Sequence, residues 1–166
     1  MNKRRTTKKT SSIQKTHKRE KTVVLCSSAS FYEKAIEVQR ELRAMGYNVA
    51  IPLTAGRMAK RGDFNVDKVK TWYDDPSLYT KKKFLTKHHF KKIEKGDIVL
   101  VLNYEKNGRP GYIGGAVLAE MAIGLHFNKP IAILNPIDET VGYKEEILGT
   151  LPLILHGDLS RLADAF

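Results

Sequence analysis

Glu120 is the residue that most clearly points to chemistry in this sequence. It is the only formally charged residue in an apolar stretch of helical length, residues 116–127. A carboxylate is costly to bury unless it is paired, hydrogen-bonded or protonated. A glycine-rich turn precedes the stretch, which places Glu120 near the start of a helix. Parallel sheets bind ligands at the carboxyl ends of their strands, close to the start of the helices that follow. Glu120 is therefore a candidate site residue. The alternative is a place on the solvent-facing or subunit-facing side of a mostly buried helix.

Small polar residues follow three of the apolar runs that have the character of buried strands. They are Ser27, Ser28 and Ser30 after the first run, Asn103 after the third, and Asn135 after the fourth. Serine hydroxyls and free backbone N–H groups at a helix N-terminus suit a phosphate or a sugar hydroxyl. The alternatives are that the serines cap the first helix and that the asparagines belong to ordinary polar turns.

The turn before the Glu120 helix offers further candidate contacts. Gly114 and Gly115 would let a ligand approach the backbone closely, although tight turns need glycine in any case. Tyr112 could stack on a base or a sugar, or it could cover the end of the sheet. His88 and His89 lie on a basic helix, where a structural role is the simpler interpretation of either one.

Several kinds of chemistry find no support in the sequence. There is no P-loop, no complete G-x-G-x-x-G after the first strand and no serine nucleophile elbow. The single cysteine, Cys26, argues against a disulfide framework and a cysteine-based metal site, and its place in a strand favours a small buried hydrophobic role. No spacing of His, Cys and Asp is typical of a metal site, so neither a metal nor a cofactor is expected.

Apolar runs and helical periodicity alternate along the chain. Strands are expected at residues 22–27, 47–51, 98–102, 130–134 and 151–155. Helices are expected at residues 30–45, 80–94, 116–127, 144–148 and 158–166. Ser30 and Glu33 form a capping-box pattern. Residues 53–79 are expected to be irregular, with a short helix near 66–72, and a connection this long is typical of a lid or binding loop.

This alternation predicts one α/β domain, a Rossmann-like or flavodoxin-like three-layer sandwich. Its parallel sheet of five strands should have the order 2-1-3-4-5, with helices on both faces. The carboxyl ends of the strands would then face one crevice. The serine, asparagine and glutamate candidates would meet there.

The positive charge is concentrated at the N-terminus. Residues 1–21 hold nine Lys or Arg residues against one acid, so +8 of the net charge of +11 lies in this segment. Such a segment predicts a disordered basic tail, with the folded domain at 22–166. The tail could contact nucleic acid without sequence preference, or it could be a solubilising extension without a specific partner. No secretory signal or membrane-length apolar run is present, which favours the cytoplasm and no membrane contact.

The motifs around Glu120 resemble those of the nucleoside 2-deoxyribosyltransferase-like superfamily, which includes deoxynucleoside monophosphate N-glycosidases. The resemblance spans roughly residues 22–135 and is carried by 97–103, the glycine turn, 119–124 and 128–131. It implies that Glu120 is the nucleophile that attacks the anomeric carbon of the sugar. It also implies that Ser27 and Ser28 lie in the region that holds sugar or phosphate, and that the protein is a homo-oligomer.

Two functions remain open on this basis. The first is an N-glycosidic-bond hydrolase or deoxyribosyltransferase acting on a nucleoside or nucleotide, with Glu120 and Asn103 as catalytic residues. The second is a binding module on the same fold, because the transferases have an aspartate where this chain has Asn103 and an amide cannot act as a carboxylic acid. A nucleic-acid-associated protein is a third, weaker hypothesis, since no base-reading motif accompanies the basic residues.

Overall fold

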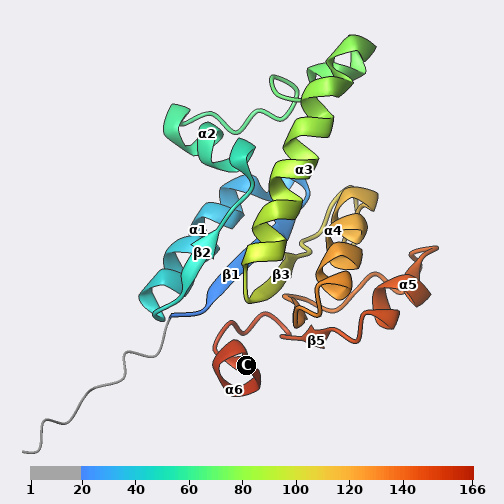
Figure 1. The fold of residues 1–166 in the computed structure, drawn as a ribbon. Coiled ribbons are helices and arrows are strands. Elements are labelled where there is room, and N and C mark those ends of the chain that lie inside the picture. Colours follow the sequence, from blue (N-terminus) through green and yellow to red (C-terminus); the bar gives the residue numbers. More distant parts are fainter. Residues whose placement is uncertain (1–19) are drawn as a thin grey trace, which may run out of the picture.

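The computed structural model describes residues 20–166, and most of the predicted basic tail lies outside them. Five parallel strands form one sheet in the order β2-β1-β3-β4-β5, so the predicted fold class and strand order are confirmed (Figure 1). The strands are β1 (Thr22–Ser27), β2 (Asn48–Ala50), β3 (Ile98–Leu102), β4 (Ile131–Ile133) and β5 (Leu153–Ile154). β1 and β3 are the longest of them, and they lie next to each other near the centre of the sheet.

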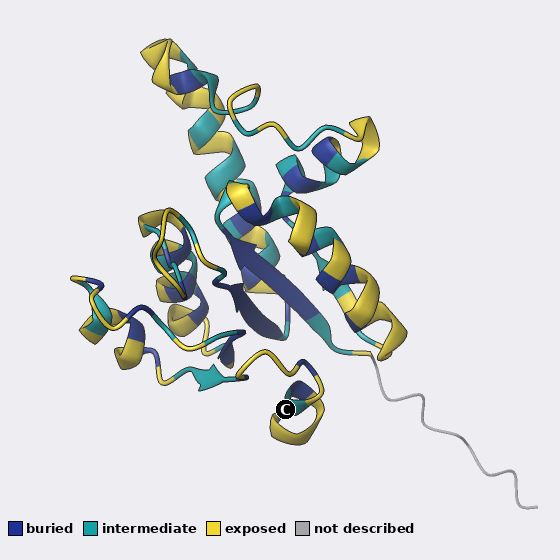
Figure 2. Ribbon diagram, turned by 180° about the vertical axis from the view of Figure 1, so that it is seen from behind, coloured by how far each residue is buried: buried dark blue, intermediate teal, exposed yellow. Residues whose placement is uncertain are grey.

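Helices cover both faces of this sheet and create two hydrophobic cores. On one face pack α1 (Tyr32–Ala44) and α6 (Arg161–Ala165), and on the other pack α3 (Tyr79–Lys95), α4 (Gly115–His126) and α5 (Lys144–Gly149). Both faces of the central strands are therefore buried, as the dark ribbons in Figure 2 show. This is why their sequences are continuous apolar runs rather than alternating ones.

Alternation along β1 decides which side chains can reach the site. Successive residues of a strand point to opposite faces. Leu25 therefore packs in the core beneath α1, whereas Cys26 packs in the core beneath α3 and α4. The thiol of Cys26 is fully buried on the face that also receives Glu120 from α4.

The segment predicted to be irregular contains a regular helix, so that prediction was wrong for its first part. α2 (Leu53–Arg61) begins after Pro52 and ends at Gly62, which has a left-handed φ of 64°. Two of its own residues, Ala55 and Met58, are completely buried and form its inner face. Burial of this face outweighs the low helix propensity of Gly56, which made the segment look irregular in sequence. The short helix expected near 66–72 is instead a 3-10 turn at Thr71–Tyr73.

The capping box predicted at Ser30 and Glu33 does not form. A 3-10 turn at Ala29–Phe31 precedes α1, the N-cap position is Phe31, and no side chain caps the helix. The backbone N–H of Phe31 bonds to the carbonyl of Ser28 instead, and this turn moves Ser30 to the surface.

α3 extends well past the end of the sheet, as Figure 1 shows. Two 3-10 turns, Thr71–Tyr73 and Pro76–Leu78, pack beside its first half. The ammonium group of Lys82 on α3 lies 5.9 Å from the ring centre of Trp72. This arrangement builds a wall above the carboxyl end of β1. No helix among residues 20–166 combines the length and the apolar character needed to cross a bilayer.

Candidate active site

A cavity of about 490 Å³ opens at the carboxyl end of β1, between α3 and α4. Its floor and walls come from β1, α3, α4 and the 3-10 segment that follows α2. Among the residues that line it are the predicted Ser27, Ser28, Tyr112, Gly114, Gly115 and Glu120. The structure thus brings together six of the candidate residues from two separate parts of the sequence, residues 27–28 and 112–120. A cavity of this size suits a small organic ligand.

Glu120 projects from the second turn of α4 into this cavity. Its side chain is only 15% exposed, and its Oε2 atom has no hydrogen-bond partner among the described residues. Burial raises the pKa of Glu120 to about 8, although the neighbouring Cys26 thiol and the Lys82 ammonium both act in the opposite direction. In the ligand-free protein the carboxyl group is therefore mostly protonated at neutral pH.

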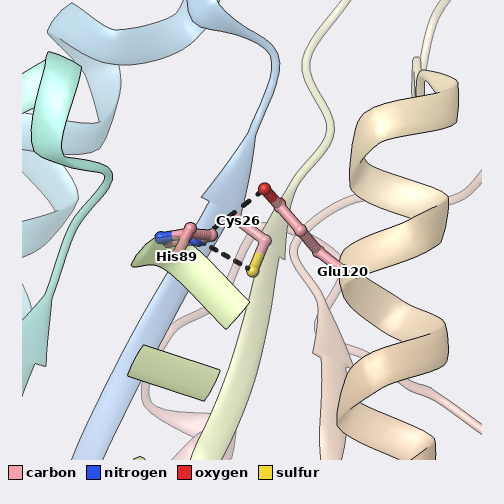
Figure 3. A group of neighbouring side chains, drawn as sticks. All are labelled: Cys26, His89 and Glu120. Carbon is pink, nitrogen blue, oxygen red and sulfur yellow. Dashed lines mark hydrogen bonds and ion pairs between the residues drawn. The ribbon is translucent and has the colours of Figure 1, made fainter. Parts of the chain in front are cut away.

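His89 of α3 faces Glu120 across the bottom of the cavity. The Nε2 atom of His89 lies 3.8 Å from Glu120 Oε1 and 3.5 Å from Cys26 Sγ (Figure 3). Burial is the main reason that the pKa of His89 falls to about 4, and the nearby Lys92 lowers it further. At neutral pH the pair is therefore a neutral imidazole beside a carboxylic acid. An ion pair at this position would have to form in low-dielectric surroundings.

Cys26 on β1 is the third residue that lies beside Glu120 and His89 at the bottom of the cavity. Its thiol is fully buried, and burial raises its pKa well above the ordinary value, with Glu120 acting in the same direction. A reactive cysteine has a lowered pKa and is accessible. Cys26 has neither property, so it is not a candidate nucleophile.

The start of α4 forms another wall of the cavity. Gly114 is the N-cap residue, no side chain caps the helix, and residues 114–117 line the cavity. The first N–H groups of a helix have no partner within it and carry the positive end of the helix dipole. A Cβ atom on Gly114 would lie 2.9 Å from the hydroxyl oxygen of Tyr112, so glycine keeps the aromatic ring close to this helix end.

Lysine side chains surround the upper part of the cavity. Lys106 Nζ donates a hydrogen bond to Ser28 Oγ at 3.2 Å and lies 4.8 Å from the ring centre of Tyr112. Lys70 and Lys82 also line the cavity, and partial burial and the charge of Lys106 lower the pKa of Lys70. The lysines and the start of α4 together create an electropositive site that favours an anionic ligand.

Three predicted site residues lie outside the cavity lining: Ser30, Asn103 and Asn135. Ser30 is exposed, whereas Asn103 is completely buried. The amide of Asn103 donates to the carbonyls of Asn135 at 2.9 Å and Pro136 at 3.2 Å, and its oxygen accepts from the Asn135 N–H at 2.8 Å. These bonds join the ends of β3 and β4. Asn103 is therefore placed to hold together the loops that follow these two strands.

Several residues of the cavity lining were not predicted from the sequence, namely Tyr32, Lys70, Trp72, Tyr73, Lys82 and Lys106. Trp72 is the only tryptophan in the chain and sits in a long connection, which is a usable signal for a binding loop. The lysines gave no such signal, because lysines are common throughout this basic chain. Only the packing of α3 and the 3-10 segment against β1 separates the lysines of the cavity from those on the surface.

Comparison with known proteins shows a distant likeness. No protein-family model and no curated protein matches the chain. Among solved structures, the chain is similar to a 2-deoxyribosyltransferase from the psychrotolerant bacterium Bacillus psychrosaccharolyticus. The two share 18% sequence identity with a TM-score of 0.44, over 74% of this chain and 78% of the other. At this level of identity the similarity is a distant one and concerns the fold alone.

Proposed function

We propose that the protein cleaves the N-glycosidic bond of a nucleoside or nucleotide, by hydrolysis or by transfer of the sugar. One observation carries this proposal: a buried carboxyl group, Glu120, faces a ligand-sized cavity from an otherwise apolar helix. A carboxylate in such a position can attack an anomeric carbon and stabilise the positive charge that develops on the sugar ring. The motif resemblance found in the sequence assigns the same role to Glu120.

The rest of the cavity supports a substrate of this class. Tyr112, Trp72 and Tyr73 offer aromatic surfaces for a base, and Ser27 and Ser28 offer hydroxyl groups for a sugar or phosphate. Three lysines and the start of α4 favour a substrate with an anionic group. We therefore place nucleotides ahead of uncharged nucleosides.

Protonation of Glu120 makes the proposed reaction pH-dependent. A nucleophile must be ionised, and the pKa of Glu120 is about 8 in the ligand-free protein. The value of kcat/KM reports the ionisation of the free enzyme. It should therefore increase about tenfold per pH unit below pH 8 and level off above it. If Glu120 acted instead as a general acid, kcat/KM would decrease above that pH.

The direct test is incubation with deoxynucleosides, ribonucleosides and their monophosphates, followed by chromatography for the free base. Glu120→Gln keeps the size of the side chain and should reduce kcat by more than about 10³-fold, as removal of a nucleophile does elsewhere. Glu94→Gln removes a carboxylate from the exposed side of α3 and is the matched control. Full activity in Glu120→Gln would exclude Glu120 as the nucleophile.

A non-catalytic binding module is the second candidate. It is favoured by the same raised pKa, because a carboxyl group that stays protonated at neutral pH can hold a ligand by hydrogen bonding without attacking it. A nucleotide that raises the melting temperature but yields no free base at any pH from 6 to 9 would support this function. Ligand at about one hundred times its Kd should add about 2.7 kcal/mol to the stability.

A further inference from the structure

Three side chains able to ligate a metal ion meet at the bottom of the cavity. Cys26 comes from β1, His89 from α3 and Glu120 from α4, and their ligand atoms all lie within 4.8 Å of one another (Figure 3). No sequence pattern indicates such a site, because the three residues are far apart in the chain and it has only one cysteine. We propose that this group binds a zinc-type divalent cation through the thiolate, the imidazole Nε2 atom and the carboxylate.

The two distances from His89 Nε2 to the other ligands are close to those of tetrahedral coordination. Zinc bonds of about 2.3 Å to sulfur and about 2.0–2.1 Å to nitrogen place these two atoms about 3.5 Å apart in a tetrahedron. The observed distance from Cys26 Sγ to His89 Nε2 is 3.5 Å. Nitrogen and oxygen ligands would be about 3.4 Å apart. The distance from His89 Nε2 to Glu120 Oε1 is 3.8 Å, so rotation of the Glu120 side chain is the main adjustment.

A buried carboxylate oxygen without a partner supports a further ligand at this site. The side chain of His89 is 5% exposed, and its Nε2 atom faces both other residues. Glu120 Oε2 has no hydrogen-bond partner among the described residues, and neither does His89 Nδ1, although the Leu25 backbone is close enough to act on the pKa of this imidazole. A buried polar group without a partner is costly, and a bound cation would give the carboxylate one.

The charges of two ligands match that of a divalent ion, although the surroundings are basic. The positive charges of Lys82 and Lys92 lower the pKa of His89, and they would also repel a bound cation. A thiolate and a carboxylate together supply a charge of −2, which balances a divalent ion. Binding releases the thiol proton, and the proton of any neutral carboxyl group, to solvent. Thiolate and imidazole ligands favour zinc over magnesium or calcium. The cavity next to His89 and Glu120 gives the ion an entry path and leaves the fourth position for water or a ligand.

Cobalt(II) is a spectroscopic probe for this site, because a thiolate bound to cobalt gives an intense near-ultraviolet charge-transfer band. Cys26 is the only cysteine, so the band can arise only there. One equivalent of cobalt should produce the band in the full-length protein, zinc should abolish it, and excess magnesium should not. No band at millimolar cobalt would overturn the proposal, and this measurement needs no variant.

Variants then test each ligand. Cys26→Ser, with Cys26→Ala as a second variant in case the hydroxyl disturbs the core, should lose the band. His89→Gln and Glu120→Gln should each weaken cobalt binding by at least about tenfold, since even outer-shell substitutions cost that much. His126→Gln, at the exposed end of α4, is the control and should bind normally. A band of unchanged affinity in both His89→Gln and Glu120→Gln would show thiol-only coordination and refute the site.

The effect of the ion on catalysis rests on the proposed function. A metal bound to Glu120 would occupy the proposed nucleophile, so zinc should inhibit base release and a chelator should restore it. The two proposals fail separately. A cobalt band without base release under any condition leaves the metal site standing and removes the glycosidase function. Base release without a band does the reverse.

Discussion

Replacing Glu120 by glutamine should stabilise the folded protein by an amount that grows with pH. Burial raises the pKa of Glu120 from 4.5 to about 8. Between these two pH values the unfolded chain has lost this proton while the folded chain keeps it. Stability decreases with pH wherever the folded state binds more protons, here by about 1.36 kcal/mol per pH unit. Glutamine does not titrate, so the variant escapes this loss.

The size of the effect follows from the same shift. From pH 5.5 to pH 7.5 the stability difference between Glu120→Gln and the wild type should grow by about 2.7 kcal/mol. Over the whole window from pH 4.5 to about 8 it should grow by about 5 kcal/mol and then stay constant. Any effect of glutamine on packing adds a constant offset that does not change with pH.

Urea unfolding of both proteins at half-unit pH steps, with a chelator present, measures this difference. Other titrating groups are common to the two proteins and largely cancel. A stability difference that does not change between pH 5.5 and 7.5 would refute the reasoning, because Glu120 would then have an ordinary pKa and lie in contact with water.

Three further results are expected. In the Glu120→Gln background, stability should decrease by about 3 kcal/mol from pH 6.5 to pH 4. The reason is that histidine in the unfolded chain takes up its proton near pH 6.5, whereas the folded His89 does so only near pH 4. Adding His89→Gln should remove this decrease of stability with falling pH, as measured by urea unfolding. Asn103→Asp should destabilise the protein by about 2–5 kcal/mol, more at pH 7 than at pH 4, because two backbone carbonyls lose their amide donor and face a carboxylate; an unchanged unfolding midpoint would contradict this. Lys106→Met should weaken binding of a nucleoside monophosphate at least about tenfold in calorimetry while sparing the nucleoside, whereas exposed Lys91→Met should change neither.

Most of the fold follows from local sequence patterns. The continuous apolar runs at 22–27 and 98–102 are buried on both faces, which is the condition for the interior strands of a parallel sheet. The alternation of these runs with helical segments then restricts the topology to a small number of arrangements. The helix of residues 53–61 was missed because its burial comes from packing against α1 and α3, which local propensity does not show.

Part of the candidate site could likewise be predicted from the sequence, and part could not. A lone charge in an apolar helix marked Glu120 from the sequence alone, because burying a carboxylate is costly wherever the helix packs. Its partners His89 and Cys26 could not be recognised. Cys26 and His89 are 63 positions apart in the chain, and only the packing of α3 over β1 brings the two side chains together. The raised pKa of Glu120 is likewise a property of the enclosed cavity floor, since exclusion of water and the placement of neighbouring charges exist only in the folded chain.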